Sequence, residues 1–331
     1  MKEQLIEAIV KSKILSEWHW FVYQFQFLKF GQHTPFSEDF VDKIFCVETK
    51  IPGFAIETVK RMASICGREK YIPHYEQLLQ LLVEVIIFAR LAQEFQDSSL
   101  SFEWEPTAGN TKTNPELKIS GADWNALVEV KCPSLINHLQ TAPDNDVQLA
   151  ARLSPDPSAF KSFSKSGDVT MPLDNKVKDF LVSAEKKFYP FKETGAKSFS
   201  LLVIAWDDKM FEAVSPLING MSGLLTENSF YRDAGNSPIV FPSVDGVLIT
   251  EHLGSALRGT REEQLPIGFS TPLDYGNLTA PGFVPPVFLS NPSASNSDTN
   301  AMNKIIKALG GFPLSEASDP RVQPMDMVFW L

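Results

Sequence analysis

Four charged residues in one short segment offer the most direct chemistry in this sequence. Glu116, Asp123, Glu129 and Lys131 all lie in PELKISGADWNALVEVKCPS, residues 115–134. Carboxylates are the ligands that Mg²⁺ prefers, and a lysine beside them could orient or stabilise a water molecule that attacks a phosphodiester. The alternative is a hairpin that carries an ordinary exposed ion pair, which contributes little to stability. The helices and strands predicted around this segment decide between a metal site and an ordinary ion pair.

Strand geometry indicates which of the four residues can lie close enough together to share a metal ion. Side chains alternate along ALVEVK, residues 126–131, so Glu129 and Lys131 share one face of a predicted strand. The preceding ELKIS forms a hairpin with it around the turn sequence GADWN, which places Glu116 opposite or diagonal to Glu129. Asp123 falls in the turn, on the order of 16 Å from Glu129, whereas two ligands of one Mg²⁺ each lie at about 2.1 Å from it. We therefore predict Glu116 as the second metal ligand and keep Asp123 as the second choice.

The elements around the hairpin change from helical to strand periodicity. Apolar positions recur at helical spacing in HYEQLLQLLVEVIIFARLAQEF and again in DNKVKDFLVSAEKKF, whereas SFSLLVIAW is a continuous apolar run, typical of a strand buried on both faces. The predicted elements are a helix over 74–95, strands over 100–105, 116–120 and 126–131, a helix over 174–188, and strands over 198–206 and 244–250. This order predicts an α/β fold with a mixed central sheet and helices on its faces.

Three regions follow from these patterns along the 331 residues. Residues 1–70 have helical periodicity and form a helical N-terminal region. Residues 71–253 form the core, with an irregular insertion rich in Pro, Ser and Asp near 135–172. Residues 254–331 form a Pro-rich C-terminal extension with one helix.

Composition excludes several classes of protein. Apolar residues make up 44% of the chain, yet no uninterrupted apolar run is long enough to cross a bilayer, so we expect a cytoplasmic protein with no membrane segment. The three cysteines give neither a disulfide framework nor a zinc pair.

The net charge of −10 argues against a protein that coats nucleic acid along its length. Any contact with nucleic acid must then be local, for example through the lysines of residues 161–197. The motifs GxSxG, GxxxxGK[ST] and GxGxxG do not occur.

The spacing of these charged residues matches a motif of a known family. Pro115-Glu116, followed after twelve residues by Glu129-Val130-Lys131, resembles the PD-(D/E)XK nuclease superfamily, whose core runs helix, three strands, helix, strand. The resemblance covers residues 74–206 and implies a restriction-endonuclease-like core. It departs from the family at Glu116, since aspartate is commoner at that position.

The resemblance implies a Mg²⁺-dependent hydrolase, with Mn²⁺ as a substitute, that cleaves nucleic acid, DNA above all, as an endo- or exodeoxyribonuclease. Its implied catalytic residues are Glu116, Glu129 and Lys131. The implied metal ligands are Glu84, from the helix over 74–95, together with Glu116 and Glu129. Glu84 also continues a polar stripe on that helix, so a solvated helix edge explains it equally well. The alternative function is a nuclease-like fold kept as a catalytically inactive binding or assembly module.

Three further residues lie near the predicted site. Lys186 and Lys187 are candidates for contact with nucleic-acid phosphates, although lysines late in a helix also complement its dipole. His138, seven residues after Lys131, is interpreted as structural. The sequence leaves open a homodimer or another protein partner.

Overall fold

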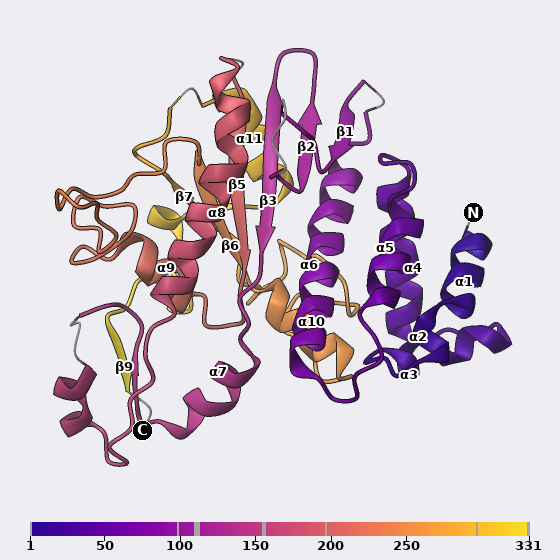
Figure 1. The fold of residues 1–331 in the computed structure, drawn as a ribbon, viewed down its shortest axis with the longest axis horizontal. Helices are drawn as coiled ribbons and strands as arrows, with labels where there is room; N and C mark the ends of the chain where they lie inside the picture. Colours follow the sequence, from indigo (N-terminus) through magenta and orange to yellow (C-terminus); the bar gives the residue numbers. More distant parts are fainter. Residues whose placement is uncertain are drawn as a thin grey trace.

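A mixed β-sheet runs through the centre of the protein, with helices on its faces (Figure 1). The computed structural model describes residues 2–97, 99–108, 113–153, 157–195, 197–295 and 297–329. Residues 154–156 of the predicted insertion lie outside the described residues. The α/β class and the mixed sheet predicted from the sequence are confirmed.

The described strands of the central sheet number seven. In order across the sheet they are β1 (Ser101–Trp104), β2 (Leu117–Ser120), β3 (Asn125–Lys131), β5 (Phe199–Ala205), β6 (Gly246–Thr250), β7 (Val287–Ser290) and β8 (Phe312–Pro313). Strands β1, β2 and β3 are antiparallel, β3, β5 and β6 are parallel, and β7 runs antiparallel to β6 and parallel to β8. A separate pair joins β4 (Val147–Leu149) to β9 (Met327–Phe329).

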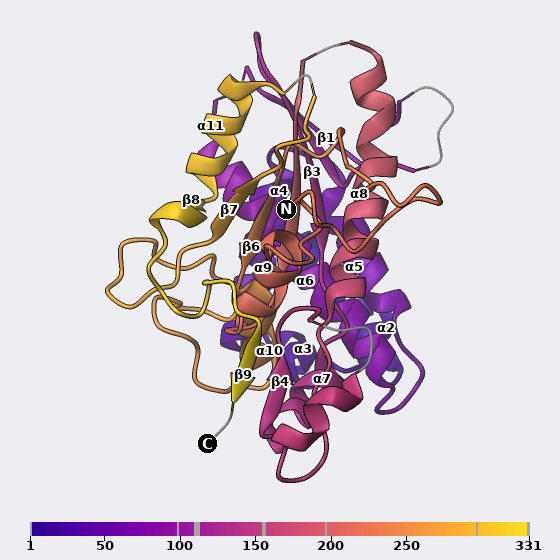
Figure 2. The ribbon, with the colours of Figure 1, turned by 90° about the vertical axis from the view of Figure 1, so that its left-hand side faces the viewer.

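Helices cover both faces of this sheet. Helix α8 (Asp174–Glu193) and helix α11 (Thr299–Ala308) both contact β3 and β5, and they lie on opposite sides of the sheet (Figure 2). Helix α6 (Ile72–Glu94) runs beside β3, on the side away from β5 (Figure 1). The remaining α-helices are α1 (Lys2–Lys11), α2 (Lys13–Ser16), α3 (Val22–Phe25), α4 (Pro35–Glu48), α5 (Phe54–Ser64), α7 (Ile136–Thr141), α9 (Phe211–Ile218) and α10 (His252–Thr260).

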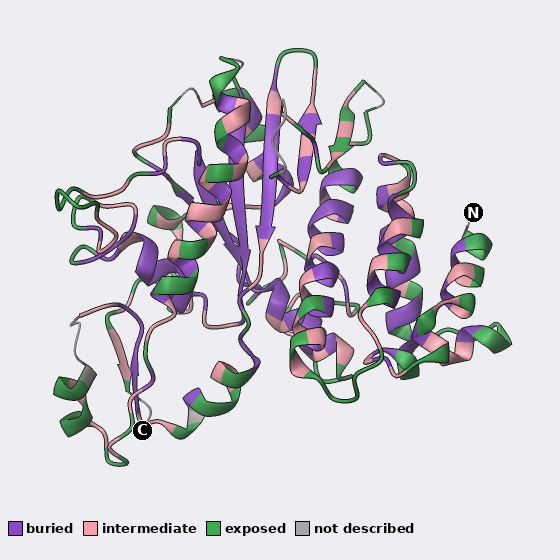
Figure 3. Cartoon of the chain, viewed as in Figure 1, coloured by how far each residue is buried: buried purple, intermediate pink, exposed green. Residues whose placement is uncertain are grey.

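One hydrophobic interior connects the N-terminal helices to the sheet. Every residue of β5 and β6 is buried, as expected for parallel strands covered on both faces. Helix α6 is apolar around most of its circumference because α4, α5 and α10 pack against it as well as β3. Figure 3 shows buried residues continuing from the central strands into the inner sides of these helices.

The element order from α6 to β5 follows the sequence prediction: helix, strand, hairpin, helix, buried strand. The C-terminal region contributes more than the single helix predicted there, because β7 and β8 extend the sheet and α11 covers one face. No helix among the described residues is long and apolar enough to cross a membrane.

Candidate functional site

The β2–β3 hairpin places two glutamates side by side. Leu117 pairs with Val128 and Lys118 with Leu127, so the next pair along the ladder is Glu116 and Glu129. Directly opposed residues of an antiparallel pair lie on the same face, with Cβ atoms about 5 Å apart. Two carboxylates at this separation repel each other unless a cation lies between them.

Two lysine ammonium groups supply that positive charge. Lys131 Nζ lies 2.6 Å from Glu129 Oε1, from the next position on the same face of β3. Lys187 Nζ, from helix α8, donates to the same oxygen at 2.6 Å and to Glu116 Oε1 at 3.1 Å. Hydrogen bonds between charged groups are stronger than neutral ones, and here they tie β2, β3 and α8 together at one point.

Glu129 is the most deeply buried member of this cluster. Its side chain is fully buried, and burial raises the pKa of its carboxyl, an effect that Lys131 opposes. Both ammonium groups contact Oε1, whereas Oε2 is buried and accepts no hydrogen bond from any described residue. A buried carboxylate oxygen without a donor is costly, so this atom is poised to bind a cation or a donor from a ligand.

Glu84 supplies a third carboxylate, from helix α6. It lies midway along α6, partly exposed in a stretch that is otherwise apolar, and accepts a hydrogen bond from Gln80 at 3.4 Å. Burial raises its pKa to about 8, and the charge of Glu116 adds to the effect, whereas Lys131 opposes it. Glu84 is therefore within electrostatic range of Glu116 and Lys131, although the hydrogen bond that it accepts comes from Gln80 on its own helix.

Asp123 lies outside the cluster, in the hairpin turn. The ladder ends at the pair Ser120–Asn125, and the Gly121 amide donates to the Trp124 carbonyl at 2.9 Å to close the turn. Asp123 is exposed, and its Oδ2 accepts from Asn300 of α11 at 3.3 Å. The geometry therefore groups Glu116, and not Asp123, with Glu129.

The two lysines singled out on α8 differ in their surroundings. Lys186 is exposed, whereas Lys187 is half-buried and bonded to both glutamates of the hairpin. The sequence suggested phosphate contact for both and missed the ion pairs of Lys187. A signal was present: Lys187 lies three residues after Ala184 and directly before Phe188, both fully buried, so it borders the core face of the helix.

The family resemblance implies Mg²⁺, so the oxygen atoms of the three glutamates can be compared with the ligands that this ion requires. Three glutamates supply the hard oxygen ligands that Mg²⁺ requires, and Glu129 Oε2 is a buried acceptor without a donor among the described residues. As they stand, however, no three acidic, His or Cys side chains in the described part of the chain surround a common metal position. The ammonium of Lys187 lies between Glu116 and Glu129 instead. The glutamate oxygens are of the chemical kind that Mg²⁺ binds, but Lys187 would have to leave its position before Glu116 and Glu129 could share such an ion.

A cavity of about 260 Å³ adjoins the cluster. Lys118 and Leu127, the pair next to Glu116 and Glu129 on the same sheet face about 7 Å along the strands, line it together with Phe191 of α8. Ser198 also lines it, and its hydroxyl is buried with no hydrogen-bond partner among the described residues. The cavity therefore offers an apolar wall, an aromatic ring, a hydroxyl and the side chain of Lys118, whose ammonium lies 3.5 Å from Glu103 Oε2.

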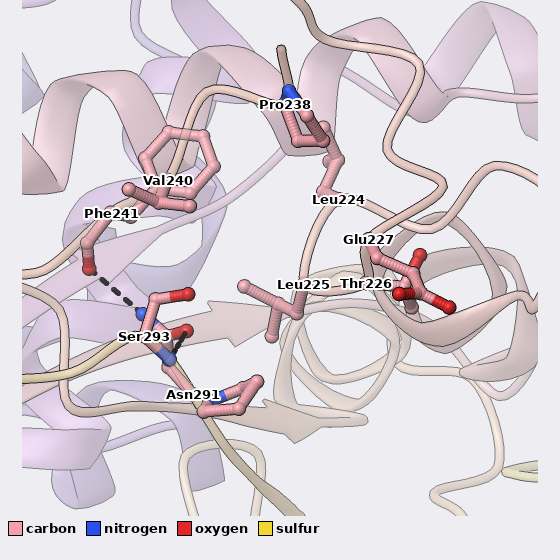
Figure 4. Close-up of a pocket in the computed structure, with 10 residues that line it drawn as sticks. Leu224, Leu225, Thr226, Glu227, Pro238, Val240, Phe241, Asn291 and Ser293 are labelled. Carbon is pink, nitrogen blue, oxygen red and sulfur yellow. Dashed lines mark hydrogen bonds between the residues drawn. The ribbon is translucent and has the colours of Figure 1, made fainter.

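A larger cavity lies elsewhere and has a different character. This cavity has a volume of about 310 Å³. Figure 4 shows residues that line it, among them Leu225, Val240 and Asn291. The Asn291 side-chain amide donates to the Phe241 carbonyl at 2.8 Å and fixes the turn that follows β7. Glu227 is the one ionisable residue among the described residues that line it, so this cavity lacks the groups that catalysis needs.

His138 belongs to a second polar cluster near the carboxyl end of β5. Its Nε2 lies 3.2 Å from Oε2 of the buried Glu212, which also accepts hydrogen bonds from Gln148 and from Trp206 Nε1. Burial raises the pKa of the adjacent Asp207 to about 7, and Glu212 adds to this effect. These contacts agree with a structural interpretation of His138, since they join α7, β4 and α9.

Comparison with protein-family models, with curated proteins and with solved structures found no match to this chain.

Proposed function

We propose that this protein is a metal-dependent nuclease of the PD-(D/E)XK type, acting on DNA. The single observation that carries the proposal is the placement of Glu116, Glu129 and Lys131 together at the β2–β3 hairpin. Glu84 of α6, whose pKa responds to these charges, is proposed as the third acid. The order of elements from α6 to β5 supports a restriction-endonuclease-like core, because the resemblance implies that order.

Each residue has a distinct part in the proposed reaction. Glu84, Glu116 and Glu129 would hold Mg²⁺ or Mn²⁺, which when bound supplies Lewis-acid stabilisation of the charge that develops on the phosphate. Glu129, buried and fixed on a central strand, sets the position of the site. Lys131, adjacent on the same face, orients the attacking water and stabilises the developing negative charge near it.

The surroundings accommodate a nucleic-acid strand locally. Lys118 and Phe191 line the cavity beside the cluster, where a base adjacent to the scissile phosphate could lie against the aromatic ring. Lys186 and Lys176 are exposed on α8 and offer charges for backbone phosphates. These contacts are local, in keeping with a chain whose net charge is −10.

Cleavage by variants of the cluster tests the proposal. We expect Glu129→Gln and Lys131→Ala each to lower Mg²⁺-dependent cleavage of plasmid or single-stranded DNA by at least about 100-fold. Asp123→Asn is the matched control, because it removes an acid from the same hairpin outside the cluster, and we expect it to cleave at the wild-type rate. Wild-type cleavage by both cluster variants, with circular dichroism showing an intact fold, would contradict the assignment.

One observation favours a second candidate, a catalytically inactive binding or assembly module. In the described part of the chain the acids do not surround a metal position, and Lys187 neutralises two of them. Calorimetric titration with Mg²⁺ separates the candidates. Heat of binding accompanied by cleavage supports the nuclease, whereas no binding and no cleavage support the inactive module.

A further inference from the structure

Lys187 has a place in the glutamate cluster that the proposed reaction does not use. We infer that its ammonium is the internal counter-cation of the site: it holds Glu116 and Glu129 together when no metal is bound, and it competes with a divalent cation for the space between these two carboxylates. The inference rests on the proposed function, because it concerns how the site takes up its metal.

The fold directs this lysine inward. Helix α8 buries Leu181, Ala184 and Phe188 against the sheet, so Lys187, next to Phe188, lies at the edge of the buried face. Its side chain is 19% exposed, although a lysine usually keeps its charged end in water. Burial alone lowers the pKa of an ammonium group, yet Glu129 and Glu116 outweigh it and raise the pKa of Lys187, so the group stays charged.

The contacts of Lys187 span the two strands. Its Nζ lies 3.1 Å from Glu116 Oε1 and 2.6 Å from Glu129 Oε1, whereas Lys131 contacts Glu129. Among the described lysines, Lys187 therefore joins the two facing carboxylates. Without it, adjacent carboxylates on neighbouring strands would repel each other in a site where water is largely excluded.

The same contacts set up the competition. A divalent cation held at about 2.1 Å by oxygens of both Glu116 and Glu129 would lie within a few Å of the Lys187 ammonium, even if it used the Oε2 of Glu129 that has no donor among the described residues. The two positive charges would repel each other, so binding of the cation disfavours the position of the ammonium between the carboxylates. Apparent metal affinity is then reduced by the fraction of molecules in which Lys187 occupies the space between the carboxylates.

Substitution of Lys187 tests both parts of the inference. Lys187→Met keeps a long side chain without the charge, and Lys186→Met removes the neighbouring exposed lysine as a control. Metal-free protein, prepared with chelator, is measured by thermal unfolding, and Mn²⁺ is titrated by calorimetry. We expect Lys187→Met to lower the metal-free Tm by about 3 °C or more and to bind Mn²⁺ about tenfold more tightly than wild type. Lys186→Met should match wild type in both measurements.

The outcomes separate this inference from the proposed function. If wild type binds Mn²⁺ and cleaves DNA, but Lys187→Met has the same metal-free Tm and the same or weaker Mn²⁺ affinity, the role of Lys187 is overturned and the nuclease stands. If none of the proteins binds Mn²⁺ or cleaves DNA, the proposed function and the competition both fail. Lys187→Gln, which keeps a hydrogen-bond donor without the charge, replaces Lys187→Met if that variant does not fold, with the same expected change in affinity.

Discussion

Buried carboxyl groups at two places in this protein differ in how their charge is balanced. Glu129 is fully buried but has two ammonium groups within 2.6 Å of one oxygen. Asp207 is buried as well, and its Oδ1 accepts a hydrogen bond from the Lys209 amide at 2.9 Å, while Oδ2 has no hydrogen-bond partner among the described residues. An unbalanced buried charge costs stability, whereas a balanced one can be kept for chemistry. Glu129 is therefore suited to a functional site, whereas the charge of Asp207 lowers the stability of the fold.

The Asp207 carboxyl predicts how stability depends on pH. Burial raises its pKa to about 7, with Glu212 and Asp208 adding to the effect and Lys209 opposing it, whereas the unfolded value is about 3.9. A group whose folded pKa is raised loses its contribution to stability as the pH rises from the unfolded to the folded value. We therefore expect Asp207→Asn to stabilise the protein at pH 8 by about 2–4 kcal/mol relative to wild type and much less at pH 4.

Urea unfolding at several pH values measures this difference. Asp123→Asn is the control, because Asp123 is an exposed acid in the β2–β3 turn and is not among the groups that shift the pKa of Asp207. A constant difference between Asp207→Asn and wild type from pH 4 to pH 8 would refute the titration of Asp207 over this range.

At the scale of elements, the site depends on the pairing register of β2 with β3 and on the tight turn between them. The β2–β3 ladder sets Glu116 beside Glu129, and that register depends on the turn that Gly121 and Trp124 close. Trp124 is buried, with its ring near Phe95 and the Lys304 ammonium 4.9 Å from the ring centre. The turn thus anchors the hairpin to α6 and α11, which keeps Glu116 in register.

Gly121 is predicted to be intolerant of a side chain. A Cβ at this position would lie 2.3 Å from Trp124 Nε1, so the buried indole would have to move. We expect Gly121→Ala to lower the free energy of unfolding by about 1–3 kcal/mol, the usual range for overpacking a core. Gly220→Ala is the matched control, since a Cβ there meets no atom within 4 Å. Equal urea midpoints for the two variants would show that the turn tolerates a methyl group.

At the scale of the whole molecule, the N-terminal helices support the element that carries Glu84. Helices α4 and α5 pack on α6, Phe54 meets Phe88 with ring centres 5.9 Å apart, and Arg61 lies over the Trp104 ring. Arg61 also acts on the pKa of Glu84 and lowers it against the effect of burial. The site therefore depends on residues 1–70 as well as on the sheet.

Removal of residues 1–70 tests this dependence. The truncated chain would expose the apolar side of α6, so we expect it to lack a cooperative thermal transition by circular dichroism and to bind no metal. Full-length protein carrying the same affinity tag is the control. A truncated chain with a sharp transition near the wild-type Tm would show that the core folds by itself.

Local patterns in the sequence predicted much of the fold but only part of the site. Alternation in residues 126–131 predicts the hairpin face, and the apolar run before Trp206 predicts the buried strand β5, because both depend on neighbouring residues. The ion pairs of Lys187 depend on how α8 is rotated against the sheet, which tertiary packing determines. Strands β7 and β8 lie in Pro-rich sequence, and they form because β7 pairs with the distant β6 and β8 pairs with β7.

A crystal structure grown with Mn²⁺, with its anomalous scattering measured, tests the central claim most directly. We expect an anomalous peak within about 2.5 Å of carboxylate oxygens of Glu116 and Glu129, with Lys187 moved away from the space between them. Glu129→Gln crystals grown in the same way should lack the peak. An intact cluster at saturating Mn²⁺, with no peak and Lys187 still bonded to both glutamates, would refute a metal site at these glutamates.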